Sequence, residues 1–263
     1  MKKTIFKAYA VFAAALFVLQ TYASAENTSF SWYFKPSGNH EQPEVIPEAK
    51  SFIDKYDTIY LGDEKSNKIY LTFDAGYENG NVEKILDVLK EKNVQGAFFI
   101  LPHLVECNTD LVIRMKNEGH LVCNHTLSHK NMSKVTDFEN FSSELTDLEK
   151  IFYEYTGFEM DKFYRPPEGR FSETNLEFAD RLGYHTVFWS LAYADWDNNS
   201  QMAPEKALEL VSARTHSGCV VLLHPTSSTN AEILGKYIDN MREQGYEFST
   251  LEDFITEDDT DAN

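Results

Sequence analysis

The chain has 263 residues, which suits one sizeable domain, and its 42% hydrophobic and 25% charged content is ordinary for a globular protein. This composition excludes a disordered chain. The formal net charge of −18 makes nucleic acid a poor partner, because phosphate groups repel so acidic a protein.

Residues 1–25 have the pattern of an export signal. Three lysines lie among the first seven residues, residues 8–19 are apolar, and Ala23-Ser24-Ala25 has the small-x-small form of a cleavage site. The alternative is an uncleaved membrane anchor, but a membrane span needs about 20 apolar residues. We therefore expect a cleaved Sec-type signal peptide and a mature protein, without a stable membrane span, in the cell envelope or outside the cell.

Residues 26–66 are irregular and begin with several aromatic side chains, so we expect an N-terminal arm that packs on the main domain. A short helix is predicted after Pro47, because apolar residues recur there at helical spacing: Ala49, Phe52, Ile53 and Tyr56. At the other end, residues 257–263 form an acidic tail, which we expect to be a solvated end.

Residues 67–256 alternate between strand and helix patterns. The predicted strands are 68–74, 97–101, 121–124, 163–165, 186–191 and 219–224. The predicted helices are 82–92, 110–118, 138–155, 174–182, 204–215, 231–244 and 251–255. Such alternation indicates a parallel sheet, either open or closed into a barrel. No linker or repeat interrupts it, which favours a single domain.

Several of the predicted strands lead into a reactive side chain. These side chains are Asp74, His125, Arg165, Asp195 and His224. In parallel sheets and barrels, catalytic groups gather at the carboxyl ends of the strands. Each residue alone is weak support, but five on one predicted rim indicate an active site.

The NHTLSH stretch contains a histidine pair with HxxxH spacing. If a helical turn begins at His125, His125 and His129 share one face and can converge on a zinc-like cation. The spacing is common by chance, and two ordinary histidines are the alternative. The polar neighbours favour ligands over core residues: Asn124, Thr126 and Ser128.

Two further stretches offer both a structural and a catalytic interpretation. Pro166 pushes Arg165 into an extended conformation, which gives either an exposed arginine on a rigid turn or an arginine that keeps a buried carboxylate ionised. Asp195-Trp196 either marks a loop corner or combines an acid that orients a histidine with an indole that walls a sugar site. His224 follows an apolar run, where a lone histidine is more often structural. It becomes a catalytic candidate because the other four side chains lie on the same predicted rim.

These stretches together resemble the five motifs of the polysaccharide deacetylase family, the NodB-homology carbohydrate esterases. The motifs are TFDAG, NHTLSH, RPPEGR, ADWD and VLLH, in family order across residues 69–224. The resemblance implies an α/β fold, a distorted (β/α) barrel that is often seven-stranded. TFDAGYENG, FSWYFKPSGNHEQPE and VFWS resemble more closely the secreted branch of delta-lactam-biosynthetic de-N-acetylases.

The resemblance also implies a role for each residue on the rim. Asp74 matches the catalytic base, and Arg165 matches the arginine that tunes it. His224 matches the general acid, and Asp195 matches the acid that orients it. Tyr77 and Trp196 are candidate sugar-stacking walls, with ordinary packing as the alternative.

His125 and His129 match the metal-binding histidines of the family, which implies a divalent cation such as zinc. In most of the family the residue after the base is a second aspartate, the third metal ligand, but here it is Ala75. The resembling branch also lacks that aspartate. Water, a substrate oxygen or Glu78 is expected to replace it, and loss of an anionic ligand lowers affinity for the cation.

The residues alone predict an exported amide hydrolase that acts on an N-acetylated sugar. The resemblance implies peptidoglycan glycan strands as the partner and N-acetylmuramic acid as the substrate, deacetylated as a step towards muramic δ-lactam in spore cortex. One alternative is deacetylation of N-acetylglucosamine in peptidoglycan or chitin. Another is a non-catalytic glycan-binding protein, which Ala75 would favour and the other intact motif residues oppose.

Overall fold

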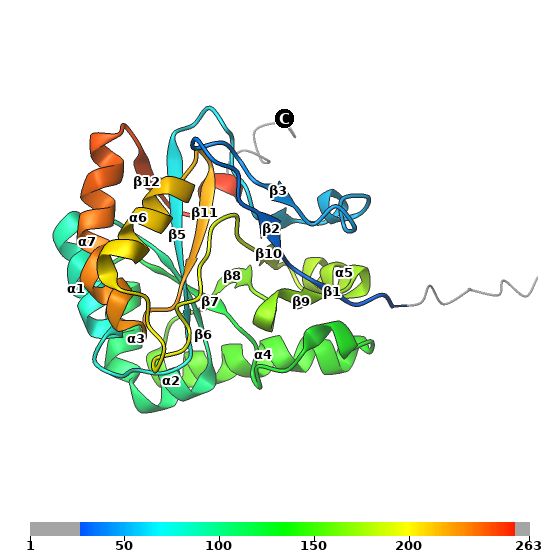
Figure 1. Cartoon of the computed structure of the whole chain (residues 1–263). Coiled ribbons are helices and arrows are strands. Elements are labelled where there is room, and N and C mark those ends of the chain that lie inside the picture. The colour runs from blue at the N-terminus through cyan, green and yellow to red at the C-terminus, as the bar shows by residue number, and fades with distance from the viewer. Residues whose placement is uncertain (1–26, 256–263) are drawn as a thin grey trace, which may run out of the picture.

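The computed structural model describes residues 27–255 of the chain (Figure 1). The expected signal peptide (residues 1–25) and the acidic tail (residues 257–263) lie outside this described part. Among the described residues, no helix is long and apolar enough to cross a membrane.

A parallel sheet forms the centre of the molecule. Its strand order is β11-β5-β6-β7-β8-β10-β4, and β12 pairs with β5 beside this path. The strands are β4 (Thr58–Ile59), β5 (Lys68–Ala75), β6 (Ala97–Ile100), β7 (Leu121–Asn124), β8 (Asp161–Tyr164), β10 (His185–Val187), β11 (Cys219–Leu223) and β12 (Glu247–Ser249). Seven strands in the main path agree with the predicted barrel type.

The sheet curls so that its two edges meet. Beyond Val187 the chain leaves β8 and runs beside β11, where Leu191 forms a parallel bridge with Val221. Two hydrogen bonds hold this bridge, from Leu191 N to Val220 O (3.2 Å) and from Leu222 N to Leu191 O (2.8 Å). The predicted strand 186–191 is therefore divided between two neighbours, which distorts the barrel.

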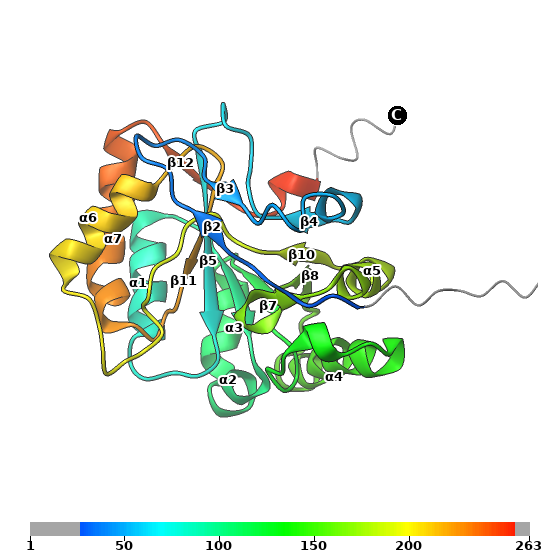
Figure 2. The same cartoon turned by 45° about the vertical axis from the view of Figure 1, so that its right-hand side comes forward.

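Helices surround the sheet on most of its outer side (Figures 1 and 2). They are α1 (Val82–Lys92), α2 (Pro102–Cys107), α3 (Thr109–Asn117), α4 (Phe138–Thr156), α5 (Glu173–Arg181), α6 (Pro204–Arg214) and α7 (Ser228–Glu243). Six of them lie within a few residues of their predicted ranges. The sequence analysis missed α2, which has only six residues and no full amphipathic period.

Strand alternation separates two apolar clusters along β5. Ile69, Phe73 and Ala75 belong to the cluster between the sheet and the helices. Tyr70 belongs to the smaller cluster that fills the barrel interior. Because successive side chains of a strand point to opposite faces, Asp74 shares the interior face with Tyr70. The interior face of the strand therefore carries the carboxylate toward the open end of the barrel.

The N-terminal arm packs on the barrel beside the third motif, in an apolar cluster that also includes Leu176 of α5. Its elements are β1 (Phe30–Ser31), β2 (Phe34–Lys35), β3 (Glu44–Val45) and the 3-10 helix η1 (Ile53–Lys55). β1 pairs antiparallel with β9 (Arg170–Phe171), beside the third motif. The short helix predicted after Pro47 is present only in part: the chain forms turns and the 3-10 helix η1 there, but no α-helix. The apolar spacing reflects burial against Phe171 and Phe188, and so short a segment gains little from helix formation.

Candidate active site

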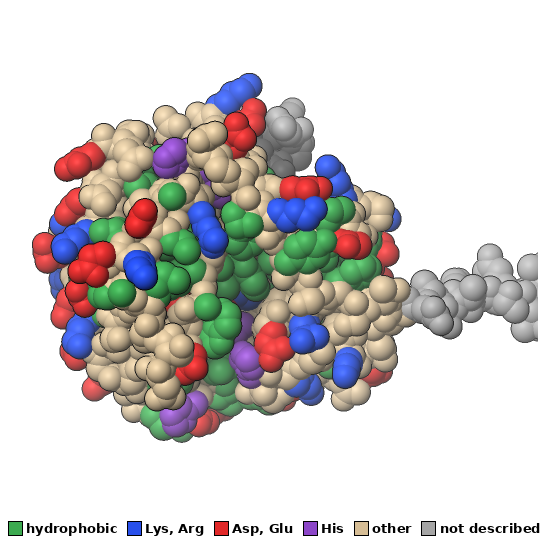
Figure 3. Space-filling model, in the orientation of Figure 1, with side chains coloured by type: hydrophobic (Ala, Val, Ile, Leu, Met, Phe, Trp, Pro, Cys, Tyr) green, Lys and Arg blue, Asp and Glu red, His purple; other side chains and the backbone are tan. Residues whose placement is uncertain are grey.

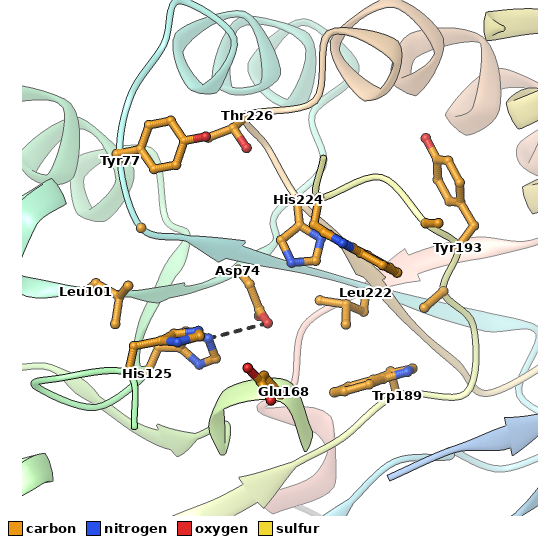
Figure 4. Close-up of a pocket in the computed structure, with 15 residues that line it drawn as sticks. Asp74, Tyr77, Leu101, His125, Glu168, Trp189, Tyr193, Leu222, His224 and Thr226 are labelled. Carbon is orange, nitrogen blue, oxygen red and sulfur yellow. Dashed lines mark ion pairs between the residues drawn. The ribbon is translucent and has the colours of Figure 1, made fainter. Parts of the chain in front are cut away.

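A cavity of about 860 Å³ opens at the carboxyl ends of the strands (Figure 4). Six of the predicted site residues line it: Asp74, Tyr77, His125, His129, Trp196 and His224. In the space-filling view the hollow has apolar side chains in its depth and histidine at its edge (Figure 3). Arg165 and Asp195 lie behind the cavity surface and bond to groups that line it.

The side chain of Arg165 is 0% exposed and is held by several hydrogen bonds. Its Nη1 donates to Asp74 Oδ1 (2.7 Å), its Nη2 to Thr72 Oγ1 (2.8 Å) and its Nε to Val187 O (3.1 Å). The guanidinium also stacks over the ring of Phe99, 4.1 Å from the centroid. The alternative of an exposed arginine on a turn is therefore wrong.

Asp74 is held in its ionised form by this environment. Burial alone would raise the pKa of Asp74, but the charge of Arg165 and the proximity of His125 and His224 outweigh burial and lower it. The carboxylate therefore stays charged at neutral pH. Its Oδ2 lies 3.6 Å from His125 Nε2, which Figure 4 marks with a dashed line.

His125 directly follows β7, and its ring orientation is fixed by the backbone of the third motif. Its Nδ1 lies 2.9 Å from the carbonyl oxygen of Arg165, so Nδ1 carries the hydrogen and Nε2 has a free lone pair. Burial lowers the pKa of His125 to about 4, despite the opposing effect of Asp74. His125 is therefore a neutral imidazole with an acceptor nitrogen aimed toward Asp74.

The NHTLSH segment is a loop, so the helical turn considered for it is wrong. Thr126 (φ 74°) and His129 (φ 51°) adopt left-handed conformations. Asn124 Oδ1 accepts a hydrogen bond from Thr126 N (2.9 Å), and Thr126 Oγ1 accepts one from His129 N (3.0 Å). These side-chain bonds compete with helix formation. The loop still brings the rings of His125 and His129 within 5.1 Å, edge to face.

Two imidazoles therefore fit part of the coordination shell of a divalent cation, through ring nitrogen donors. Ala75 is buried and apolar, and Glu78 lines a different cavity together with Glu83 and Cys107. Within residues 27–255, no group of three histidine, cysteine or acidic side chains is arranged to hold a metal ion. The donor set suits a weakly held cation whose shell is completed by water or substrate.

His224 forms the second charged pair of the site. Its Nδ1 donates to Asp195 Oδ1 (2.7 Å), and its backbone N donates to Asp195 Oδ2 (2.8 Å). Burial lowers the pKa of His224, but the hydrogen bond and charge of Asp195 outweigh burial and raise it overall. His224 therefore carries a proton more readily than a free histidine does, and its Nε2 is left for the cavity.

Asp195 is held by a residue that the sequence analysis missed. Asn230, in the first turn of α7, donates from Nδ2 to Asp195 Oδ2 (2.6 Å) and to His224 O (3.0 Å). Tyr193 in turn donates its hydroxyl to Asn230 Oδ1. Because Asp195 is almost fully buried, these bonds satisfy a carboxylate that water cannot reach. The sequence signal that could have identified Asn230 is a polar residue on the buried face at the start of a predicted helix.

Tyr77 and Trp196 stand at the mouth of the cavity and are 42% and 62% exposed. Asn198 Nδ2 donates to the Tyr77 hydroxyl (2.6 Å), which joins the loop after β5 to the loop after Asp195. The Trp196 ring lies edge-on to His224, with centroids 6.3 Å apart. Their exposure leaves both aromatic faces free to contact a ligand.

The cavity has further walls that the sequence analysis missed. Glu168, Trp189 and Leu101 line it, and Figure 4 shows Glu168 and Trp189 below Asp74. Glu168 has a left-handed backbone (φ 56°), which side-chain-bearing residues rarely adopt. The sequence analysis named none of the three as a site residue, although Glu168 lies in RPPEGR and Trp189 lies in VFWS.

Comparison with known proteins places these features in a family. Residues 62–187 match the family model described as polysaccharide deacetylase. The chain is 41% identical over 231 residues to the peptidoglycan-N-acetylmuramic acid deacetylase PdaA of Bacillus subtilis, covering 88% of each chain. It is 32% identical over 205 residues to a peptidoglycan-N-acetylglucosamine deacetylase of Bacillus cereus, covering 76% of this chain and 73% of that one.

The fold agrees with these sequence matches. The structure of Bacillus subtilis PdaA, described as a family 4 carbohydrate esterase, superposes with a TM-score of 0.84 at 40% identity. The match covers 89% of this chain and 100% of that one. A family 4 carbohydrate esterase from Bacillus anthracis superposes with a TM-score of 0.71 at 40% identity, covering 88% and 97%.

Proposed function

From the premise that this chain belongs to the polysaccharide deacetylase family, we propose that it removes the acetyl group from N-acetylmuramic acid in peptidoglycan. As a PdaA-type member of the family, the chain is a peptidoglycan deacetylase, a hydrolase that acts on an amide. The choice of sugar is the proposal. It is supported by the name of the 41% identical relative, a peptidoglycan-N-acetylmuramic acid deacetylase.

The observation that carries the proposed chemistry is a pair of oppositely tuned groups on one cavity. Arg165 keeps the pKa of Asp74 low, and Asp195 keeps the pKa of His224 high. The carboxylate of Asp74 is therefore a proton acceptor at neutral pH, and the imidazolium form of His224, a proton donor, persists to a higher pH than in a free histidine. Two titratable groups whose pKa values are pushed apart are the pattern expected of a base and an acid.

In the proposed reaction, Asp74 takes a proton from water while the water oxygen attacks the acetyl carbonyl carbon. Backbone N–H groups of the third motif hold the developing oxyanion. His224 Nε2 then donates its proton to the nitrogen as the C–N bond breaks, which releases acetate and the free amino sugar. Asp195 keeps the ring of His224 in the orientation that aims Nε2 at the nitrogen.

His125 and His129 are the residues that would hold a divalent cation of the kind on which this family generally depends. When bound, such a cation supplies Lewis-acid polarisation of the acetamide. With only these two imidazoles offered and Ala75 in place of an acid, we expect the affinity for the cation to be low. Both histidines also bound the space in front of Asp74, so they shape the position of the acetyl group.

The setting of the reaction is proposed on the same grounds. Residues 1–25 would direct export and be removed, residues 26–66 would form the arm, and residues 67–256 the catalytic domain. The protein would then work in the cell envelope on glycan strands whose stem peptides have been removed. The freed amine of muramic acid can attack the lactyl carboxyl group and form muramic δ-lactam, which would place the enzyme in spore-cortex maturation.

Deacetylation of N-acetylglucosamine is a second candidate with a specific observation in its favour. Among the residues that line the cavity there is no lysine or arginine to receive the lactyl carboxylate of muramic acid. Two relatives that are named peptidoglycan-N-acetylglucosamine deacetylases are each 32% identical to this chain. A non-catalytic glycan-binding role would leave the Asp74–Arg165 and His224–Asp195 pairs without purpose, so we do not favour it.

Mass spectrometry of peptide-free muramyl glycan strands, incubated with the mature protein, tests the proposal. Loss of acetyl groups from muramic acid, absent with Asp74→Asn, is the expected result. A parallel reaction with a chelator reports whether a loosely held cation is needed. Loss of acetyl groups from N-acetylglucosamine oligomers alone would move the assignment to the second candidate, and no loss from either glycan would favour the binding role.

A further inference from the structure

Trp32 of the N-terminal arm is buried against the active site, although it precedes every motif in the chain. It is 5% exposed. Its backbone N donates to the carbonyl of Gly169 (2.8 Å), and its indole Nε1 donates to the carbonyl of Trp189 (2.8 Å). Its ring stacks on Phe188, with centroids 4.3 Å apart and planes at 11°.

The first of these contacts holds a turn that the backbone does not favour by itself. Glu168 and Gly169 are consecutive left-handed residues, with φ of 56° and 63°. A side-chain-bearing residue in this region is strained and persists only where its surroundings hold it. A Cβ added at Gly169 would lie 2.8 Å from Trp32 Cβ and 2.9 Å from Trp189 Cη2. The Cβ of Trp32 and the indole of Trp189 therefore both lie directly against the Glu168–Gly169 turn.

The other contacts reach the cavity wall and the catalytic base. Trp189, whose carbonyl accepts from Trp32, lines the cavity together with Glu168. Phe188, which stacks under Trp32, offers its carbonyl to Arg165 Nη2 (3.3 Å). Arg165 is the residue that holds Asp74. Trp32 thus contacts three parts of the site: the Glu168–Gly169 turn, the cavity wall at Trp189, and Phe188, which follows β10 and accepts a hydrogen bond from Arg165.

We propose that Trp32 is a positioning residue of the deacetylation site, and that the arm is therefore a working part of the catalytic unit. The catalytic part of this inference rests on the proposed function, whereas the contacts of Trp32 do not depend on it. A residue that only filled the apolar cluster would need no N–H donor. Trp32 uses two N–H groups on carbonyls beside the cavity, and removal of the indole donor would leave the part-buried carbonyl of Trp189 without this partner.

Two variants separate positioning from packing. Trp32→Phe keeps an aromatic ring for the stack on Phe188 but removes the Nε1 donor to Trp189. Phe52→Leu is the matched control, because Phe52 belongs to the same buried cluster and contacts Phe30 and Phe171 but makes no hydrogen bond to the site. For both, kcat and KM are measured on the glycan that the wild type deacetylates, with the thermal midpoint. Amide hydrogen exchange is measured over residues 168–171 and 188–192.

We expect Trp32→Phe to lower kcat/KM about tenfold, mainly through KM, because small displacements of positioning groups have large kinetic effects. We also expect faster exchange in both segments. Phe52→Leu, at an equal or larger loss of thermal midpoint, should keep KM and the exchange rates. If the two variants behave alike, Trp32 is a packing residue and the inference fails. An inactive wild type would overturn the proposed function, while the exchange comparison would still decide the role of Trp32.

Discussion

Arg165 places its Nη1 2.7 Å from Asp74 Oδ1 while its own side chain has no exposed surface. A buried guanidinium with this many partners cannot turn to another anion, so Arg165 is the leading cause, ahead of His125 and His224, of the lowered pKa of Asp74. A carboxylate with a lowered pKa is ionised above that pKa and loses its charge as the pH falls through it. The pair therefore determines the acid limb of the reaction.

Arg165→Met tests this relationship because it keeps an unbranched side-chain stem and removes the guanidinium with its charge. Burial of Asp74 is then unopposed by the guanidinium, so its pKa rises. We expect kcat/KM at neutral pH to fall about 10²-fold or more, and the acid limb of the pH profile to move to higher pH. Arg114→Met, which removes a partly exposed ion pair on α3, is the control that should keep both. An unmoved acid limb would show that another group is the base.

Asp195→Asn tests the opposite end of the profile. The pKa of His224 is raised, so its protonated form is present below that pKa and is lost as the pH rises through it. Without the charge of Asp195 the pKa of His224 falls, so activity should be lost at a lower pH. Because Asn also disturbs the tautomer of the histidine, we expect kcat to fall about 10³-fold or more. The basic limb of kcat/KM against pH is the measurement, and a limb in the wild-type position would contradict the assigned acid.

The groups at the strand ends could be predicted from the sequence because their positions follow from local pattern. Asp74 ends an apolar run, and alternation along that run places it on the interior face beside Tyr70. The position of Arg165 could likewise be predicted, because the proline that follows it favours an extended backbone at Arg165. The strand and helix ranges were close for the same reason, since period and glycine stops are local signals.

The parts that could not be predicted depend on contacts between distant segments or on side-chain bonds to the backbone. Trp32 lies 157 residues from Trp189, and no local pattern joins them. Asn230 reaches Asp195 only because α7 begins beside His224. The NHTLSH loop departed from a helical turn because Asn124 and Thr126 bond to its backbone, which spacing alone does not reveal.

A cation bound by two imidazoles should be lost easily. We expect calorimetric titration of the wild type with Zn²⁺ to show weak binding that a chelator reverses, because no third protein ligand completes the site in residues 27–255. His125→Ala and His129→Ala should each abolish that binding. His103→Ala is the control, since His103 lies on α2 beside Cys107 and does not line the cavity. Binding that survives in both site variants would place the cation elsewhere.

Trp196→Ala should weaken substrate binding without changing the chemical step. Its ring is 62% exposed at the cavity mouth and makes no hydrogen bond that holds the catalytic groups, so the fold should keep its thermal midpoint. Loss of an aromatic contact worth about 1 kcal/mol would raise KM about fivefold at unchanged kcat. Tyr153→Ala, which removes an exposed aromatic ring on α4, should leave KM unchanged. A fall in kcat with constant KM would place Trp196 in the catalytic step instead.

Gly169→Ala should destabilise the fold through the Glu168–Gly169 turn. The added methyl group combines a left-handed backbone (φ 63°) with contacts of 2.8 Å to Trp32 and 2.9 Å to Trp189. We expect a loss of about 2–4 kcal/mol, the sum of backbone strain and overpacking. Gly157→Ala is a matched control, because Gly157 is also left-handed (φ 73°) at the end of α4 but has nothing within 4 Å of the added Cβ. Its cost should be about 1 kcal/mol, from the backbone alone. Thermal or denaturant unfolding of both variants measures the difference, and equal losses would mean that Trp32 and Trp189 yield to the methyl group and do not clamp the turn.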